Sequence, residues 1–172
     1  LTLAAYGGGS SAGDISITNS IFNVNGGITL LAGWDGIDFS SSSIADSGGN
    51  ITLSQSWLMS SGPINLWAGG NITLQSNGTA STVVGSGTTM DVVASGLKLL
   101  AGNSAFGSGL VTLEAGGSQT ITIHNGGTLE VRAGNGNNNE AWIHGGGQHI
   151  SFTDGGLLTV YGGGGGNGRG PS

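Results

Sequence analysis

Residues 48–53 read GGNITL, and residues 69–74 read the same six letters. In each copy a glycine pair precedes an apolar, a polar and a second apolar residue. Two side chains therefore point to one side of a strand, and the residue between them points to the other. Looser copies of this pattern run from one end of the chain to the other. The sequence predicts a repeat protein whose repeat unit is a β-strand.

Pairs of apolar residues in alternation mark the other predicted strands. The pairs are Ile15 and Ile17, Ile28 and Leu30, Ile37 and Phe39, Ile64 and Leu66, Met90 and Val92, Leu97 and Leu99, Val111 and Leu113, Ile121 and Ile123, Leu129 and Val131, Ile150 and Phe152, and Leu158 and Val160. Less regular apolar pieces lie at 21–24, 83–84 and 142–143. No window shows helical spacing without an interrupting glycine, so helix should be nearly absent.

The spacing of the strongest strands predicts a solenoid. Their second inward residues, roughly 20 positions apart, are Leu30, Leu53, Leu74, Val92, Leu113, Val131 and Phe152. This period predicts an all-β, single-domain parallel β-helix, or β-solenoid, with about eight coils of roughly 20 residues and a height of roughly 40 Å. We expect the solenoid to span residues 1–161 and a glycine-rich tail or linker to span 162–172. A β-sandwich of hairpins is the weaker alternative.

Composition excludes several kinds of partner. Glycine supplies 38 of the 172 residues, charged residues make up 7%, and the formal net charge is -6. Lys98, Arg132 and Arg169 are the only cationic residues apart from histidine, too few for nucleic acid or an anionic membrane surface. The chain has no cysteine for disulfides or thiolate sites, and no apolar run of roughly 18 residues that would span a membrane.

The repeats resemble those of a known group of surface proteins. GGNITL, together with ITLLAG at 28–33 and INLWAG at 64–69, resembles the repeats of the filamentous haemagglutinin-like adhesins that Gram-negative bacteria secrete through two-partner systems. The resemblance covers most of the chain. It implies a right-handed β-helical shaft, secreted or displayed on the outer cell surface, with adhesive or toxic activity located elsewhere. The Asn-Pro-Asn-Gly type motif of that family's secretion domain is not matched here, which favours a shaft segment.

Large side chains directly after the inward pairs predict a partner-contact surface. The residues at these outward positions are Leu31, Trp67, Leu100 and Tyr161. An exposed apolar strip of this kind is the usual mark of a binding surface, here for a host or cell-surface glycan or a protein receptor. A loop that folds over these residues is the alternative. Glu114 and Arg132 are expected one coil apart and close enough to form an ion pair.

Carboxylates occur singly rather than in catalytic pairs. A carbohydrate-active β-helix, a lyase or a hydrolase, would need Asp35, Asp38 or Asp91 to cluster with Lys98 or Arg132 in one groove. No such spacing is visible in the sequence. We therefore predict no catalytic residue and keep the enzyme as the alternative function.

The histidines and the polar loops do not predict a metal or cofactor site. His124, His144 and His149 have no carboxylate or cysteine companions at ligand spacing. Residues 135–140 offer oxygen ligands but lack the aspartate-rich period of calcium-binding β-rolls. We interpret these residues as surface or turn positions.

A row of threonines suggests ice binding as a remote alternative. The row consists of Thr29, Thr52, Thr73 and Thr112, and it is interrupted by Asp91, Glu130 and Ser151. Threonine is also favoured on strand surfaces for its β-branched shape, which is the simpler interpretation.

Both ends of the predicted solenoid lack a polar cap. The outermost strands carry Leu1 and Leu3 at one end and Leu158 and Val160 at the other. An uncapped coil exposes strand edges and an open core. We therefore expect copies to stack end to end, as in a secreted adhesin shaft or the subunit of an extracellular filament.

Overall fold

The computed structural model describes residues 1–7, 12–40, 48–77, 80–102, 109–134 and 139–162. Over these ranges the chain forms β-strands and no helix, so none of the described residues belongs to a helix able to cross a membrane. The expected glycine-rich tail at 162–172 lies outside the described residues from 163 onward. The all-β prediction is confirmed.

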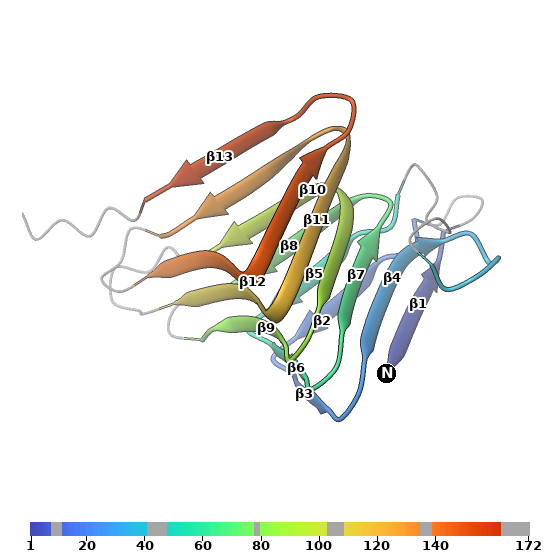
Figure 1. Cartoon of the computed structure of the whole chain (residues 1–172), viewed down its shortest axis with the longest axis horizontal. Coiled ribbons are helices and arrows are strands. Elements are labelled where there is room, and N and C mark those ends of the chain that lie inside the picture. Colours follow the sequence, from blue (N-terminus) through green and yellow to red (C-terminus); the bar gives the residue numbers. More distant parts are fainter. Residues whose placement is uncertain (8–11, 41–47, 78–79, 103–108, 135–138, 163–172) are drawn as a thin grey trace, which may run out of the picture.

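The strands stack in parallel on three faces of a solenoid, which we name A, B and C (Figure 1). Face A contains β1 (Thr2–Tyr6), β4 (Ile28–Trp34), β7 (Ile64–Ala68), the first part of β10 (Met90–Leu100), the middle of β11 (Leu110–Arg132) and the end of β12 (Glu140–Phe152). Face B contains β2 (Ile15–Thr18), β5 (Ile51–Ser54), β8 (Asn71–Gln75), the ends of β10 and β11, and β13 (Leu157–Tyr161). Face C contains β3 (Ile21–Val24), β6 (Trp57–Ser60), β9 (Thr82–Ser86) and the first parts of β11 and β12.

The chain passes through faces A, B and C five times and then adds a face A and a face B strand of a sixth turn. Equivalent outward residues on face A are Thr2, Thr29, Asn65, Asp91, Thr120 and His149, which are 26 to 36 positions apart. The fold class is as predicted, but the period of roughly 20 residues and the count of about eight coils are wrong. The short period arose because successive strong strands lie on different faces: Leu30 is on face A, whereas Leu53 is on face B. Six layers at about 4.8 Å give a height of roughly 28 Å, not 40 Å.

The inward residues form one continuous core. Ile28, Ile64 and Met90 follow one another in register on face A and are 0, 0 and 2% exposed. The predicted inward pairs of the confirmed strands belong to this core or to its partly buried rim, except Ile150, Leu158 and Val160 in the last turn, which are exposed. The predicted strand at Ile37 and Phe39 does not form: both side chains are exposed, and Phe39 stacks on Trp34 with ring centroids 4.8 Å apart.

The repeated GGN at the corner between faces A and B has a direct structural role. Asn50 donates from its backbone N to Asp14 Oδ1 at 2.7 Å, and Asn50 Oδ1 accepts from the backbone N of Asn71 at 2.9 Å. A Cβ on Gly70 would stand 2.6 Å from Asn50 Oδ1, and one on Gly96 would stand 2.5 Å from Asn71 Oδ1. Glycine thus leaves room for an asparagine ladder that links successive turns.

Candidate functional site

The four residues expected to form one partner-contact surface lie on two faces. Leu31 and Trp67 are register neighbours on face A, and they are only 0 and 9% exposed. Large outward side chains on rungs about 4.8 Å apart cover one another, and the Trp67 indole also donates to Asp91 Oδ2 at 2.8 Å. The expectation that Leu31 and Trp67 form an exposed apolar strip is therefore wrong.

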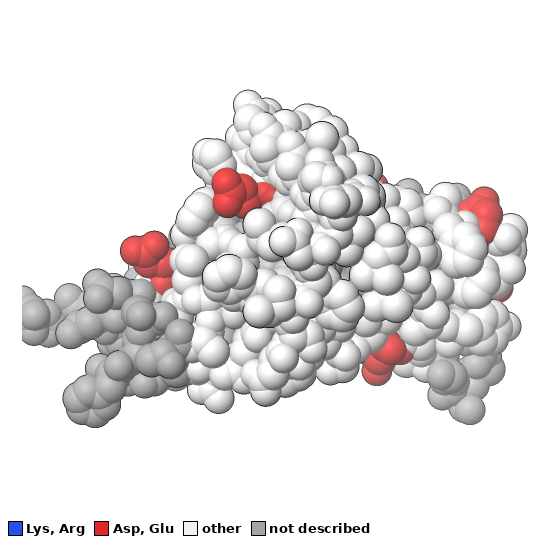
Figure 2. All heavy atoms as spheres, turned by 90° about the horizontal axis from the view of Figure 1, so that it is seen from below, with Lys and Arg blue, Asp and Glu red and all other residues white. Residues whose placement is uncertain are grey.

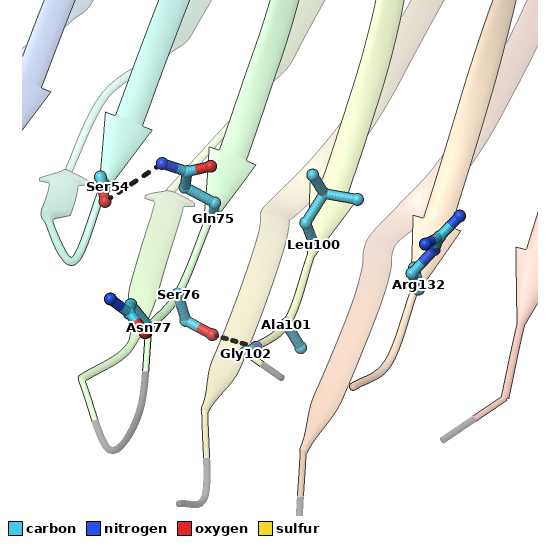
Figure 3. Close-up of a pocket in the computed structure, with 8 residues that line it drawn as sticks. All are labelled: Ser54, Gln75, Ser76, Asn77, Leu100, Ala101, Gly102 and Arg132. Atoms are coloured by element: carbon cyan, nitrogen blue, oxygen red, sulfur yellow. Dashed lines mark hydrogen bonds between the residues drawn. The ribbon is translucent and has the colours of Figure 1, made fainter. Parts of the chain in front are cut away.

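Leu100 instead borders a groove on face B (Figure 3), and Tyr161 is the register neighbour of Arg132, which lines the same groove. The groove has a volume of about 380 Å³, and its outward column is made by Ser54, Gln75, Leu100 and Arg132. Gln75 Nε2 donates to Ser54 Oγ at 3.5 Å. Figure 3 shows these side chains side by side on parallel strands, so the groove runs across the turns rather than along a strand.

Arg132 is the most polar feature of this groove, and its charge is already partnered. Its Nη2 lies 2.6 Å from Glu130 Oε1, and its guanidinium stands 4.6 Å from the centroid of the Tyr161 ring. The expected pair between Glu114 and Arg132 is wrong, because Glu114 lies on face C whereas Arg132 lies on face B. The Arg132 side chain is 52% exposed, so its ion pair with Glu130 contributes only about 0–1 kcal/mol to stability.

The carboxylates named for an enzymatic groove do not join the cations of face B. Asp91 lies on face A, whereas Lys98 lies on face B. The hollow that contains Lys98 is lined by Asp14, and that carboxylate is held by Asn50. Asp35 and Asp38 follow β4, where Asp35 Oδ1 accepts from the backbone N of Ile37 at 2.9 Å. The described structure therefore does not bring these aspartates together with Lys98 or Arg132 in the way that an acid–base mechanism would require.

The histidines lie apart from one another. His144 is outward on face C, His149 is outward on face A, and both are exposed. His144 meets the edge of Trp142, with ring centroids 6.1 Å apart. Within the described ranges no three His, Asp or Glu side chains stand close enough to hold a metal ion. Of the polar stretch 135–140, only residues 139 and 140 are described.

The threonine row is divided among the faces. Thr29 lies on face A, and Thr52 and Thr73 are register neighbours on face B. Thr112 lies on face C, is 2% exposed, and has an Oγ1 without a hydrogen-bond partner. The four threonines thus do not form a single flat array.

The last turn leaves the core open at one end of the solenoid. Ile150, Leu158 and Val160 point inward but are 39, 54 and 67% exposed. Their register neighbours one turn earlier are Ile121, Leu129 and Val131, of which the first two are 0 and 1% exposed. The rim also contains one polar inward residue, Gln148, whose Nε2 donates to the buried Gln119 Oε1 at 2.9 Å.

The first turn leaves the opposite end open. Leu1 is 45% exposed, and Leu3 is only partly buried although its register neighbour Leu30 is fully buried. Phe22 on face C is likewise partly buried at this end. Strands β1, β2 and β3 each pair on one side only within the described structure.

A surface that the sequence did not indicate lies on face C. Ile21 and Trp57 are outward register neighbours and are 76 and 46% exposed. Ile21 and Trp57 line two hollows. One, of about 530 Å³, extends toward Asn23 and Met59, and the other, of about 470 Å³, extends toward Gln55. The apolar run Trp57–Met59 between serines would have been the available sequence signal, but β6 itself was not predicted.

Charge is sparse on the side of the molecule seen in Figure 2. That view looks from below, toward the side where β3 and β6 lie in Figure 1, and it shows separated carboxylates and no visible Lys or Arg. The two described cationic side chains other than histidine, Lys98 and Arg132, both belong to face B. The faces therefore differ in the chemistry that they offer to a partner.

Comparison of the chain with known protein families, curated proteins and solved structures gave no match.

Proposed function

We propose that the protein is a structural β-solenoid of the cell surface or extracellular space, a shaft segment whose copies stack end to end into a filament. The observation that supports this most directly is the state of the two terminal turns. Each turn presents strand edges without a described neighbour, together with inward apolar side chains that are half-exposed. Unpaired parallel edges and an open core are both completed by one further turn of the same kind.

A second copy supplies such a turn with the correct direction. All strand pairs between turns are parallel, so β1 of one copy can follow the end of β12 and β2 can follow β13. Faces A and B would continue directly across the junction, whereas face C, with five strands to their six, would lack one rung there. This contact is head to tail and leaves a free end on each side, so it propagates into an open filament rather than a closed dimer.

The inward side chains of the two ends also match in number and kind. Each end offers two apolar inward residues on each face: Leu3, Ala5, Ile15, Ile17, Phe22 and Val24 at one end, and Ala141, Ile143, Ile150, Phe152, Leu158 and Val160 at the other. The one mismatch is Gln148, which would face Leu1. Apolar contacts outnumber this polar one, so burial favours the junction.

The extracellular setting rests on the resemblance of the GGNITL repeats to the filamentous haemagglutinin-like adhesins. A shaft of this type would act mechanically, because continuous parallel hydrogen bonding resists bending, and it would meet receptors through its outer faces. The side of the molecule seen in Figure 2 agrees with this role, because it carries few and scattered charges.

Sedimentation velocity and negative-stain electron microscopy of the purified 172-residue chain test the proposal over a range of concentrations. Stacking predicts species that lengthen with concentration, unbranched in the images and with an axial repeat of roughly 28 Å. Single particles of one size at every concentration would overturn the filament.

A further inference from the structure

We propose that face C carries a binding site for a neutral saccharide, which we name the Trp57 platform: Ile21 and Trp57 with the flanking side chains of Asn19, Asn23 and Gln55. The site does not depend on stacking. It is built within the first three turns and was not among the residues that the repeat pattern indicated.

The Trp57 platform contains two exposed apolar side chains that do not pack into the core. Ile21 and Trp57 point outward on neighbouring strands and are 76 and 46% exposed. Neither belongs to the buried core cluster or to its partly buried rim. Farther along the same outward column the side chains become less exposed, with Val83 half-buried and Thr112 buried. The column is thus open only over its first two rungs and again at Trp142, which is 37% exposed.

The surface is hollowed on both sides of this pair. One hollow, of about 530 Å³, lies toward Asn23, Met59 and Ser61. The other, of about 470 Å³, lies toward Asn19, Gln55 and Ser81. The Trp57 side chain therefore borders two open spaces, each with an apolar wall and a polar edge.

The polar edges offer neutral hydrogen-bonding groups. Asn19 and Gln55 sit at the corner before face C with φ angles of 50 and 52°, a left-handed conformation uncommon for residues other than glycine. Gln55 Nε2 donates to the backbone O of Asn77 at 3.1 Å, which leaves its Oε1 as an acceptor. The side-chain amides of Asn19 and Asn23 form no hydrogen bond within the described part of the chain. Each amide can both donate and accept.

This combination matches the surface of a neutral sugar. A pyranose has an apolar C–H face that packs on a flat indole, and its hydroxyls lie around the ring where amides can reach them. None of the described residues that line either hollow is charged, so none of them favours an anionic or cationic ligand. A tryptophan buries roughly 150–250 Å², so Ile21 and Trp57 together fall short of the roughly 800 Å² per partner of a stable protein interface. The platform therefore fits a saccharide better than a protein.

Saturation-transfer difference NMR with three neutral probes, cellohexaose, maltohexaose and mannohexaose, tests the proposal on the purified chain. We expect at least one probe to receive saturation on its ring C–H protons, with a shift of the Trp57 indole resonance. Trp57→Ala should weaken binding at least tenfold, and Asn23→Ala and Gln55→Ala should each weaken it several-fold. Trp142→Ala is the matched control, an exposed tryptophan in the same outward column, and should leave binding unchanged.

Three results would overturn the site: no saturation of any of the three probes, equal saturation in Trp57→Ala, or loss of binding in Trp142→Ala alone. Thermal melts monitored by circular dichroism verify that each variant is folded. If Trp57→Ala does not fold, Trp57→Phe and Asn23→Ala test the site in its place. Trp57→Phe keeps an aromatic ring and should lose only part of the affinity. Sedimentation of the same samples tests whether the Trp57 platform contacts protein instead. If Trp57→Ala abolishes self-association and no probe binds the wild type, the platform contacts a second copy of the chain.

Discussion

At the scale of single residues, close approach between turns fixes where glycine is required. The backbone of Gly127 lies so near the Ser95 carbonyl of the preceding turn that an added Cβ would overlap that oxygen. Gly147, at another corner, has no atom within 4 Å of the Cβ position. We expect Gly127→Ala to lower the free energy of unfolding by about 1–3 kcal/mol and Gly147→Ala to leave it nearly unchanged. Chemical denaturation measures both, and equal effects would show that the corner backbone adjusts freely.

A second residue-scale prediction concerns the buried hydroxyl of Thr112. Its Oγ1 has no hydrogen-bond partner, so the fold carries the cost of removing that group from water. Thr112→Val keeps the shape and should raise the free energy of unfolding by about 1 kcal/mol. Thr122→Val is the control, because Thr122 Oγ1 accepts from Ser151 Oγ at 3.3 Å and should not gain stability. A loss of stability in Thr112→Val would mean that the hydroxyl is satisfied after all.

Exposure of individual outward residues was the least predictable property at this scale. The alternation correctly places Leu31 and Trp67 on the outer side of their strands, but both are buried by their neighbours in the column. Trp57 is also outward and stays 46% exposed. Whether an outward side chain is covered depends on which residues stand one turn above and below it. On face C the neighbours in a column are 26 to 36 positions apart in the sequence. The local alternation of apolar and polar residues therefore does not show which residues they are.

At the scale of strands, face C shows why some elements are hard to read from sequence. Faces A and B have Ile, Leu or Val at most of their inward positions, and their strands were predicted. On face C, polar residues replace several of them: Ser60 and Ser86 point inward and are 6 and 5% exposed. Their hydroxyls reach backbone oxygens of the preceding turn, Gly26 O for Ser60 and Gly62 O for Ser86. These polar inward residues interrupt the alternation of apolar and polar residues by which strands were predicted, and β6 was missed for that reason.

Removal of one such hydroxyl should weaken the junction between turns. Ser86 Oγ lies 2.8 Å from Gly62 O and 2.7 Å from Thr89 O, and it accepts from Thr88 N at 3.2 Å. Ser86→Ala removes these part-buried hydrogen bonds, so we expect a loss of about 0.5–1.5 kcal/mol in the free energy of unfolding. The exposed Ser118 provides the control, since Ser118→Ala should change stability by less than about 0.5 kcal/mol. Thermal or urea unfolding compares the two, and an unaffected Ser86→Ala would contradict a stabilising role for the corner hydroxyl.

At the scale of the whole molecule, the fold class followed from the sequence but the length of a turn did not. The two GGNITL copies are in fact register neighbours, with Ile51 beside Ile72, 21 positions apart. The next turn on that face is longer, from Ile72 to Leu97. Turn length varies because segments between faces differ in size, and a solenoid tolerates this as long as the inward residues stay in register. A fixed period counted from the strongest strands therefore overestimates the number of turns.

The open ends give the last prediction, which concerns assembly. Leu158 and Val160 are 54 and 67% exposed in the single molecule, so aspartate at both positions should cost the monomer little. In a stacked pair those carboxylates would be buried without a partner, and the association constant should fall by at least ~100-fold. Thr159→Asp is the matched control, because Thr159 lies between them on the outward side of β13. Sedimentation velocity compares the three proteins. Equal association in Leu158→Asp/Val160→Asp and in wild type would show that copies do not meet through this end of the core.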